Sequence, residues 1–147
     1  MDLKISHARE QDIKEIQLLL KACDLPYEDI SWNKQYFNII RDDNNIKAVC
    51  GLEIYKDSAL LRSFAVKEEL RNKGVGVKLY RYTIEHGSRE FNVHTFYLLT
   101  NTASRFFSKQ QWLGIDRNLV PKIIQESKEF SSLCPASAQC MMLSLHH

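Results

Sequence analysis

The hydrophobic pattern of the first half of the chain predicts one amphipathic helix followed by three strands. Between residues 13 and 20, isoleucine and leucine recur every three or four positions among charged residues, which is typical of a helix, and it should end near Cys23. A short apolar run at 3–6 precedes it. Longer runs of strand length follow, separated by turn-forming residues, at 36–41, 46–55 and 60–66. We therefore expect a helix and an antiparallel meander.

The second half of the chain alternates helical and extended patterns. A helix is predicted from residue 75 to a stop at Gly87, and residues 95–100 have the β-branched and aromatic side chains typical of a strand. Because a helix connects this strand to the one at 60–66, the two strands should lie parallel. Shorter helices are predicted at 103–109, with a cap at Asn101 or Thr102, and at 121–127, and strands at 112–116 and 138–145. The elements predict one α/β domain over residues 1–147, with a mixed, mostly antiparallel sheet and helices on both faces.

Composition narrows the class of protein. The chain has 147 residues, of which 44% are hydrophobic and 26% charged, values typical of one globular domain. A net charge of +2 without a basic cluster gives no reason to expect a nucleic-acid partner. No apolar run is long enough for a signal peptide or a membrane span, so we expect a cytoplasmic protein with no membrane partner. Four cysteines without a C-x-x-C pair do not predict a metal site.

The most distinctive segment is a glycine-rich loop between the 60–66 strand and the helix that follows it. Its sequence is Arg71-Asn72-Lys73-Gly74-Val75-Gly76. At a helix N-terminus, unpaired N–H groups and the helix dipole attract anions, and glycine lets the backbone approach them closely. The loop lacks the Gly-Lys-Ser/Thr of a P-loop and the third glycine of a dinucleotide fingerprint. Two interpretations stay open: a phosphate-binding loop, or a glycine turn that only caps the helix.

This R-x-x-G-x-G arrangement resembles the pyrophosphate-binding loop of the GNAT superfamily of N-acetyltransferases. The predicted order of strands and helices is similar to the GNAT fold over nearly the whole chain. The resemblance implies a parallel central strand pair that splays apart to admit acetyl-CoA, the co-substrate. It also implies cofactor-binding residues on the central strand, the loop, and the next strand and helix: Phe64, Ala65, Val66, Arg71, Asn72, Lys73, Gly74, Val75, Gly76, Val77, Asn101 and Phe107.

Four segments are similar to narrower groups within this superfamily. Residues 51–66, 96–109, 120–121 and 129–141 resemble the small acetyltransferases of arsenic-resistance operons, the ArsN type, and also the acetyltransferase domain of N-acetylglutamate synthases. The first resemblance implies acetyl transfer to the amine of a small molecule, an amino acid or an amino-acid-like arsenical, with a role in arsenic resistance. The alternatives are N-acetylation of glutamate or another amino acid, and a non-catalytic domain that binds acyl-CoA for regulation. A homodimer stays open.

Cys134 and Cys140 bear on the arsenic hypothesis, because trivalent arsenic binds thiols. The two residues lie six positions apart on either side of Pro135, so their thiols would meet only where the chain folds back. The alternative is an ordinary loop cysteine and a core cysteine.

The sequence departs from the family pattern at two positions that family members use for proton transfer. Phe107 replaces the tyrosine that protonates the leaving thiolate, and Leu60 replaces a glutamate base. A thiolate is a stable leaving group, so water or a nearby hydroxyl would suffice as the proton donor. The hydroxyl candidates are Ser104, Ser108 and Tyr97. Glu53, on the preceding strand, is the remaining candidate base, and the alternative is an exposed strand carboxylate.

Arg62 interrupts the apolar central strand, and a buried guanidinium without a partner is costly. One interpretation places Arg62 in the acceptor cleft beside Glu53, where its guanidinium would bind a substrate carboxylate. The other pairs Arg62 with Glu53 across two neighbouring strands.

Overall fold

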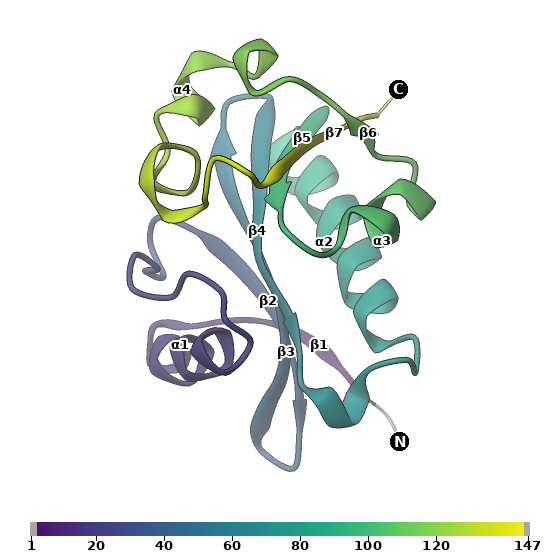
Figure 1. Ribbon diagram of the computed structural model, residues 1–147. Coiled ribbons are helices and arrows are strands. Elements are labelled where there is room, and N and C mark those ends of the chain that lie inside the picture. Colours follow the sequence, from purple (N-terminus) through teal and green to yellow (C-terminus); the bar gives the residue numbers. More distant parts are fainter. Residues whose placement is uncertain (1–2, 146–147) are drawn as a thin grey trace.

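The computed structural model describes residues 3–145, and these form one twisted sheet with helices on both faces (Figure 1). The described strands are β1 (Ile5–His7), β2 (Tyr36–Asp42), β3 (Asn45–Tyr55), β4 (Ser58–Val66), β5 (Thr95–Thr100), β6 (Leu113–Gly114) and β7 (Gln139–Ser144). Their order in the sheet is β1-β2-β3-β4-β5-β7-β6. Every neighbouring pair is antiparallel except β4 and β5, which are parallel. The predicted mixed, mostly antiparallel α/β architecture is confirmed.

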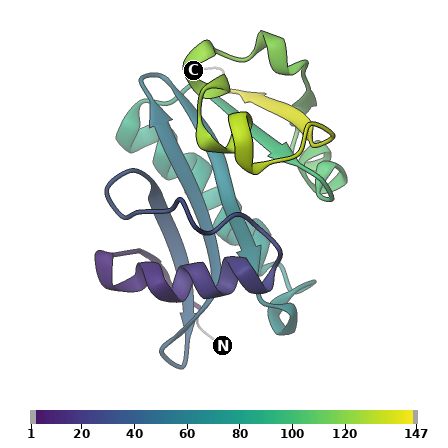
Figure 2. The same ribbon diagram turned by 60° about the vertical axis from the view of Figure 1, so that its left-hand side comes forward.

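Helices cover the two faces of the sheet unequally. Helix α1 (Ile13–Ala22) lies across one face and the longer α2 (Val75–Phe91) across the other, as the two views show (Figures 1 and 2). Two short helices, α3 (Ser104–Lys109) and α4 (Lys122–Gln125), accompany the carboxyl-terminal strands. The core under α2 includes Leu52, Leu79, Phe96 and Trp112, and the core under α1 includes Ile16, Leu20, Phe37 and Ile39. No helix within residues 3–145 is long and apolar enough to cross a membrane.

The parallel pair at the centre of the sheet is short. Strand β4 pairs with β5 only over Ser58–Leu60, opposite Thr95–Tyr97. Just beyond this pairing β4 carries a β-bulge, where Ser63 has a φ of 56° and the register with β3 shifts. From residue 61 onward β4 stays bonded to β3 along one edge, and its other edge has no strand partner among the described residues. The sheet therefore opens between β4 and β5, as the family resemblance implies.

Helix α2 runs past the stop that the sequence predicts. Gly87 is buried inside the helix, and a Cβ at this position would lie 2.7 Å from Cδ1 of Leu52 on β3. The glycine is there for close helix–sheet packing, and the helix ends at Phe91, where Asn92 takes the left-handed conformation with a φ of 56°. The prediction of a stop at Gly87 was wrong for this reason.

Two smaller predictions also differ from the structure. The cap predicted at Asn101 or Thr102 is absent: the N-cap residue of α3 is Ala103, no side chain caps the helix, and the backbone N–H of Ala103 donates to the hydroxyl of Thr100 at 2.9 Å. The strand predicted at 112–116 is only the two-residue β6, since Trp112 turns into the core and is 2% exposed.

Candidate functional site

The glycine loop lies where the sequence predicts it, between β4 and the first turn of α2. Gly74 has a φ of +78°, a left-handed conformation that favours glycine, and nothing lies within 4 Å of the position of a Cβ. No side chain caps the helix, and its first turn contains no acidic residue. The first N–H groups of this 17-residue helix are thus open to an anion, and the dipole of the helix favours one there.

The basic residues of the loop are exposed, but only Arg71 has a defined role in its shape. Its Nε donates to the carbonyl oxygen of Val66 at 2.9 Å and its Nη2 lies 3.6 Å from Sγ of Cys23, so the arginine ties the loop to the end of β4 and to α1. Lys73 is exposed. A backbone anion site flanked by two exposed cations fits a pyrophosphate group well.

The open edge of β4 leads from this loop into the sheet. Phe64, Ala65 and Val66 lie on that edge, after the bulge at Ser63. Gly76 packs under them, since a Cβ there would lie 3.4 Å from Val66 and 3.5 Å from Phe64. Backbone groups along an unpaired strand edge can hydrogen-bond an extended amide-containing chain, and the pantetheine arm of coenzyme A is such a chain.

Aromatic side chains close the α2 side of this opening. The ring centroid of Phe64 lies 5.7 Å from that of Phe106 and 6.1 Å from that of Phe107 on α3. Phe107 is 4% exposed and also packs against Tyr80, at 5.9 Å, and Trp112, at 5.5 Å. The Trp112 indole donates a hydrogen bond to the hydroxyl of Tyr80 at 2.6 Å. The position of the family tyrosine is therefore part of a packed aromatic wall.

The other residues predicted around the cofactor are placed near the end of β5. Asn101 follows β5 and is exposed, and Ser104 is the first residue of α3 and is half-buried. Tyr97 lies on β5 and is buried with Leu60 in the core on the face opposite α2, where burial raises the pKa of its hydroxyl. Ser108 is exposed on α3. A proton-donating role for Ser104 stays a prediction.

A buried ionic group, which we call the Arg62 cluster, lies on the face of β4 that Leu60 shares. It comprises Arg62, Asp29, Glu53 and Glu129. Asp29 comes from the loop between α1 and β2, and Glu129 from a short helical turn before β7. Arg62 donates from Nη1 to Glu53 at 2.6 Å, so the cross-strand ion pair that was one of two interpretations of Arg62 is present. Contact of Arg62 with a substrate stays untested.

Glu53 is held firmly within this cluster. Besides Arg62, it accepts hydrogen bonds from the hydroxyl of Tyr55 and from Nε2 of Gln35, the latter at 3.0 Å. It is 7% exposed, so it is not the exposed strand carboxylate that the sequence left as an alternative. The two oxygens of Glu53 thus accept from three protein donors.

Glu129 has the opposite character. It is 4% exposed, and its Oε1 lies 3.8 Å from Nε of Arg62, beyond hydrogen-bond distance. Burial, together with the neighbouring Glu53 and Asp29, raises the pKa of Glu129 to about 7 against the opposing effect of Arg62. A carboxyl group that exchanges its proton near neutral pH is suited to act as a general base.

The two cysteines of the arsenic hypothesis have no activated thiol. Burial raises the pKa of both Cys134 and Cys140 to about 11, so neither is a thiolate at neutral pH. Both are free cysteines, Cys140 on β7 and Cys134 in the loop before it.

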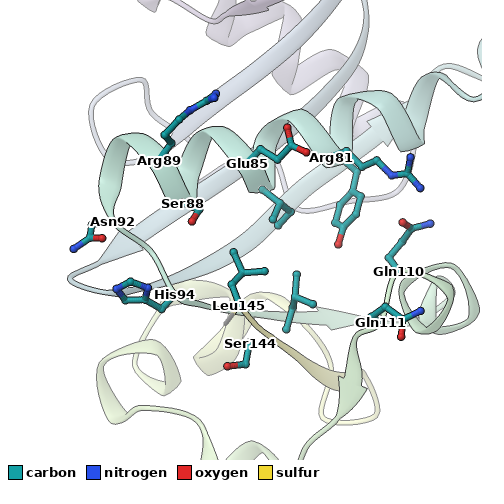
Figure 3. Close-up of a pocket in the computed structure, with 13 residues that line it drawn as sticks. Arg81, Glu85, Ser88, Arg89, Asn92, His94, Gln110, Gln111, Ser144 and Leu145 are labelled. Carbon is teal, nitrogen blue, oxygen red and sulfur yellow. The ribbon is translucent and has the colours of Figure 1, made fainter. Parts of the chain in front are cut away.

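One pocket lies away from the glycine loop and the open edge of β4. It has a volume of about 1040 Å³ and lies between the second half of α2 and the end of β7. Figure 3 shows Arg81, Glu85 and Arg89 along the helical wall, with Gln110 and Gln111 at one end. A second pocket of about 610 Å³ adjoins the glycine loop and is lined by Arg71, Lys67 and the end of α1. Because the second pocket adjoins the glycine loop, it belongs to the candidate site, and the first pocket does not.

Sequence reasoning missed Asp29, Glu129, Tyr55 and Gln35 as members of the site. Glu53 and Arg62 could be paired because their strands are neighbours in the chain. Asp29 and Glu129 come from irregular segments, so no hydrophobic periodicity predicts where their side chains point. The sequence contained one weak signal: Glu129 precedes Phe130 in an otherwise polar segment. In the structure both residues are buried.

Comparison with known proteins agrees with this geometry. The sequence matches the acetyltransferase (GNAT) family over residues 6–114, most of the chain. No curated protein matches it. The structure is similar to N-acetylglutamate synthase from Neisseria gonorrhoeae, solved with coenzyme A and N-acetyl-glutamate, with a TM-score of 0.82 and 16% identity. That similarity covers 100% of this chain but only 36% of the synthase.

Two shorter proteins are similar over almost their whole length. Rv2747 from Mycobacterium tuberculosis, solved with coenzyme A, has a TM-score of 0.79 at 16% identity, covering 97% of this chain and 99% of that one. An acetyltransferase of the GNAT family from Staphylococcus aureus has a TM-score of 0.74 at 19% identity, covering 99% and 100%. At such identities the similarity establishes the shared fold.

Proposed function

Since the chain belongs to the acetyltransferase (GNAT) family, we propose that it is an N-acetyltransferase, which moves the acetyl group of acetyl-CoA to the amine of a small molecule. Acetyl-CoA is the co-substrate. The observation that carries the proposal is the open edge of β4, which runs directly into the uncapped N-terminus of α2. The strand edge accommodates an extended amide chain, and the helix N-terminus accommodates a pyrophosphate. Coenzyme A contains both groups in that order.

The reaction asks little of the protein beyond positioning. The amine nitrogen bonds to the thioester carbon, the carbon–sulfur bond breaks, and coenzyme A leaves as a thiolate that gains a proton. Alignment of the two reactants and backbone N–H groups aimed at the developing oxyanion would supply most of the acceleration. The amine must lose a proton, and we propose Glu129 as the group that accepts it, with Glu53 as the earlier candidate now committed to Arg62.

For the acceptor, we propose a chemical class and not an individual molecule. The resemblance to the arsenic-resistance enzymes brings an amino-acid-like acceptor into consideration, and the structural similarity to N-acetylglutamate synthase adds glutamate. The occupied guanidinium of Arg62 argues against an acceptor that carries a carboxylate. The raised pKa values of Cys134 and Cys140 weaken an arsenic-binding role for their thiols. The absence of both usual proton-transfer residues keeps a non-catalytic acyl-CoA-binding domain as the second candidate function.

Substitution at Gly74 tests the cofactor site. Acetyl-CoA should raise the melting temperature of the parent, because a ligand that binds only the folded state stabilises it. Gly74→Asp should weaken acetyl-CoA binding at least tenfold by placing a negative charge beside the pyrophosphate, a loss of about 1.4 kcal/mol or more. Gly74→Asn is the matched control, since it has the same size and backbone strain without the charge. Its loss should be clearly smaller.

Two outcomes would count against the proposal. Equal binding of acetyl-CoA by the parent and Gly74→Asp, with both proteins folded, would place the cofactor elsewhere. Binding of acetyl-CoA without thiol release over a broad amine panel would favour the regulatory domain over the enzyme.

A further inference from the structure

The Arg62 cluster carries an inference about the acceptor. We propose that Asp29 determines acceptor specificity: by occupying Arg62 it excludes molecules with a carboxylate near the reacting nitrogen, so that the acceptor is a cationic amine and not an α-amino acid. This inference rests on the proposed acetyltransferase function and names the class of its acceptor.

The guanidinium of Arg62 is almost fully used by protein groups. Asp29 binds it as a fork, with Oδ2 at 2.6 Å from Nη1 and Oδ1 at 2.7 Å from Nη2. Nη1 also donates to Glu53 at 2.6 Å, and Nε donates to the hydroxyl of Ser63 at 3.0 Å. Four of the five N–H groups are therefore engaged. The two-point contact with Asp29 is the contact that a substrate carboxylate would otherwise make.

The surface of the cluster consists of carboxylate. The side chain of Arg62 is 0% exposed, whereas those of Asp29 and Glu53 are 13% and 10% exposed. A molecule that arrives from solvent thus meets acidic oxygens before it can meet the guanidinium. Like charge and the lack of free donors both act against a carboxylate at this position.

The charges in the cluster do not balance. Three carboxyl groups surround one guanidinium, and Glu129 keeps a proton up to near neutral pH. With Glu129 protonated, Asp29 and Glu53 still leave one negative charge in excess, and with Glu129 ionised, the form that can accept the proton of the amine, the excess is two. An acceptor ammonium group supplies the missing positive charge, and it must approach before it gives up its proton.

The cluster is close to the place of the chemistry. Arg62 lies two residues beyond Leu60, the last residue of β4 that pairs with β5, and one residue before the bulge at Ser63. The open edge that we assign to the pantetheine arm begins at this point. An acceptor amine that reaches the thioester here has two carboxylates as neighbours, that of Glu53 on β3 and that of Asp29 on the loop between α1 and β2.

Matched pairs of acceptors test the proposal. Each pair has an amine with and without its α-carboxylate: tyramine and tyrosine, agmatine and arginine, cadaverine and lysine, histamine and histidine. Thiol release from acetyl-CoA should give the parent a kcat/KM at least tenfold higher for the decarboxylated member of every pair that is used. In Asp29→Ala this preference should shrink at least tenfold, because Arg62 becomes free to bind the carboxylate. Glu28→Ala, the exposed neighbouring position, should keep the parent's preference.

A binding measurement gives an answer that does not depend on turnover. Glutamate and glycine should raise the melting temperature of Asp29→Ala and leave that of the parent unchanged. In Asp29→Ala combined with Arg62→Met the effect should disappear, because the guanidinium is gone. Asp29→Ala should fold, since Glu53 and Glu129 remain beside the arginine. Asp29→Asn, which keeps the side-chain size, serves in its place where the alanine variant does not fold.

Three results would overturn the proposal: an amino acid used better by the parent than its decarboxylated partner, an unchanged preference in folded Asp29→Ala, or no carboxylate effect on the stability of that variant. These results differ from failure of the acetyltransferase function itself. That failure would appear as no thiol release with any amine, while the carboxylate effect on Asp29→Ala would still be measurable.

Discussion

At the scale of a single residue, Phe107 is a packing residue at the position where the family resemblance implies a catalytic tyrosine. Its ring contacts Phe64, Tyr80, Phe106 and Trp112, and it is nearly inaccessible. The sequence shows that Phe107 carries no hydroxyl but could not show this environment, because Phe64 and Tyr80 come from distant segments.

Substitution of Phe107 should therefore affect stability more than chemistry. Phe107→Leu should cost about 1 to 2 kcal/mol in the free energy of unfolding, as lost aromatic packing, and lower kcat less than tenfold. Phe107→Tyr restores the hydroxyl, so a rise in its kcat would identify thiolate protonation as rate-limiting. Chemical denaturation and steady-state kinetics measure both effects. A loss of kcat beyond a hundredfold in Phe107→Leu, with acetyl-CoA affinity retained, would contradict the packing role.

The Arg62 cluster allows a double-mutant test at the same scale. Arg62→Met leaves buried carboxylates without their cation and should destabilise the fold by about 3 to 5 kcal/mol. Glu53→Gln keeps the hydrogen-bonding shape and should cost less. Because the double variant removes both charges, its loss should be smaller than the sum of the single losses. Unfolding curves of the four proteins give the coupling energy, and strict additivity would show that the pair at 2.6 Å contributes little.

Only half of this cluster was accessible to sequence reasoning. Arg62 and Glu53 lie on consecutive strands joined by a tight turn, so their pairing follows from register. Asp29 lies 33 positions from Arg62 in a loop without regular structure, and nothing in the spacing of residues aims it at the sheet.

At the scale of elements, Gly87 shows how one residue type can carry two meanings. Glycine ends many helices, and this was the basis of the predicted stop. In the structure it instead brings α2 close to Leu52. A glycine in the sequence is compatible both with a helix end and with close packing against another element. The two roles can be told apart only when the packing partner is known. The bulge at Ser63 was likewise not predicted, since no glycine or proline marks it within residues 60–66.

This packing predicts the effect of Gly87→Ala. Alanine is the better helix former by about 1 kcal/mol, yet its Cβ would lie too close to Leu52, so we expect a net destabilisation of about 1 to 3 kcal/mol. Thermal or chemical unfolding measures it. Glu85→Ala, on the exposed side of the same helix, should change stability by no more than about 0.5 kcal/mol. A stabilised Gly87→Ala protein would mean that the helix moves away from the sheet without cost.

At the scale of the whole molecule, Glu129 should make stability depend on pH. Its pKa is raised from 4.5 to about 7 in the folded state, so its contribution is complete below pH 4.5 and is lost as the pH rises through 7. Glu129→Gln cannot ionise. Relative to that of the parent, the melting temperature of this variant should therefore rise as the pH is raised from 5 to 8.

The acidic side of the same profile depends on another group. Burial and the nearby His86 lower the pKa of His7 below 6.5, so its contribution is present above pH 6.5 and is lost as the pH falls. This loss occurs in both the parent and Glu129→Gln, so it does not contribute to the difference between their melting temperatures. A difference that stays constant from pH 5 to pH 8 would show that Glu129 titrates normally.

The fold as a whole was the most predictable level. Runs of apolar residues and the turns between them were enough to place the strands and the parallel central pair, because register and crossover rules leave few alternatives. The shape of the site depended on contacts between loops, which those rules do not reach.

The short pairing between β4 and β5 also has a consequence for the behaviour of the protein without its co-substrate. Unpaired backbone along a strand edge is a template for other chains, and proteins usually cover or charge such edges. Here the edge from residue 61 to residue 66 is apolar apart from Arg62 and Ser63, and only the divergence of β5 and the aromatic wall shield it. Acetyl-CoA would complete the sheet as an extra strand does. We therefore predict that acetyl-CoA protects the chain against self-association and that the protein without it is the more aggregation-prone form.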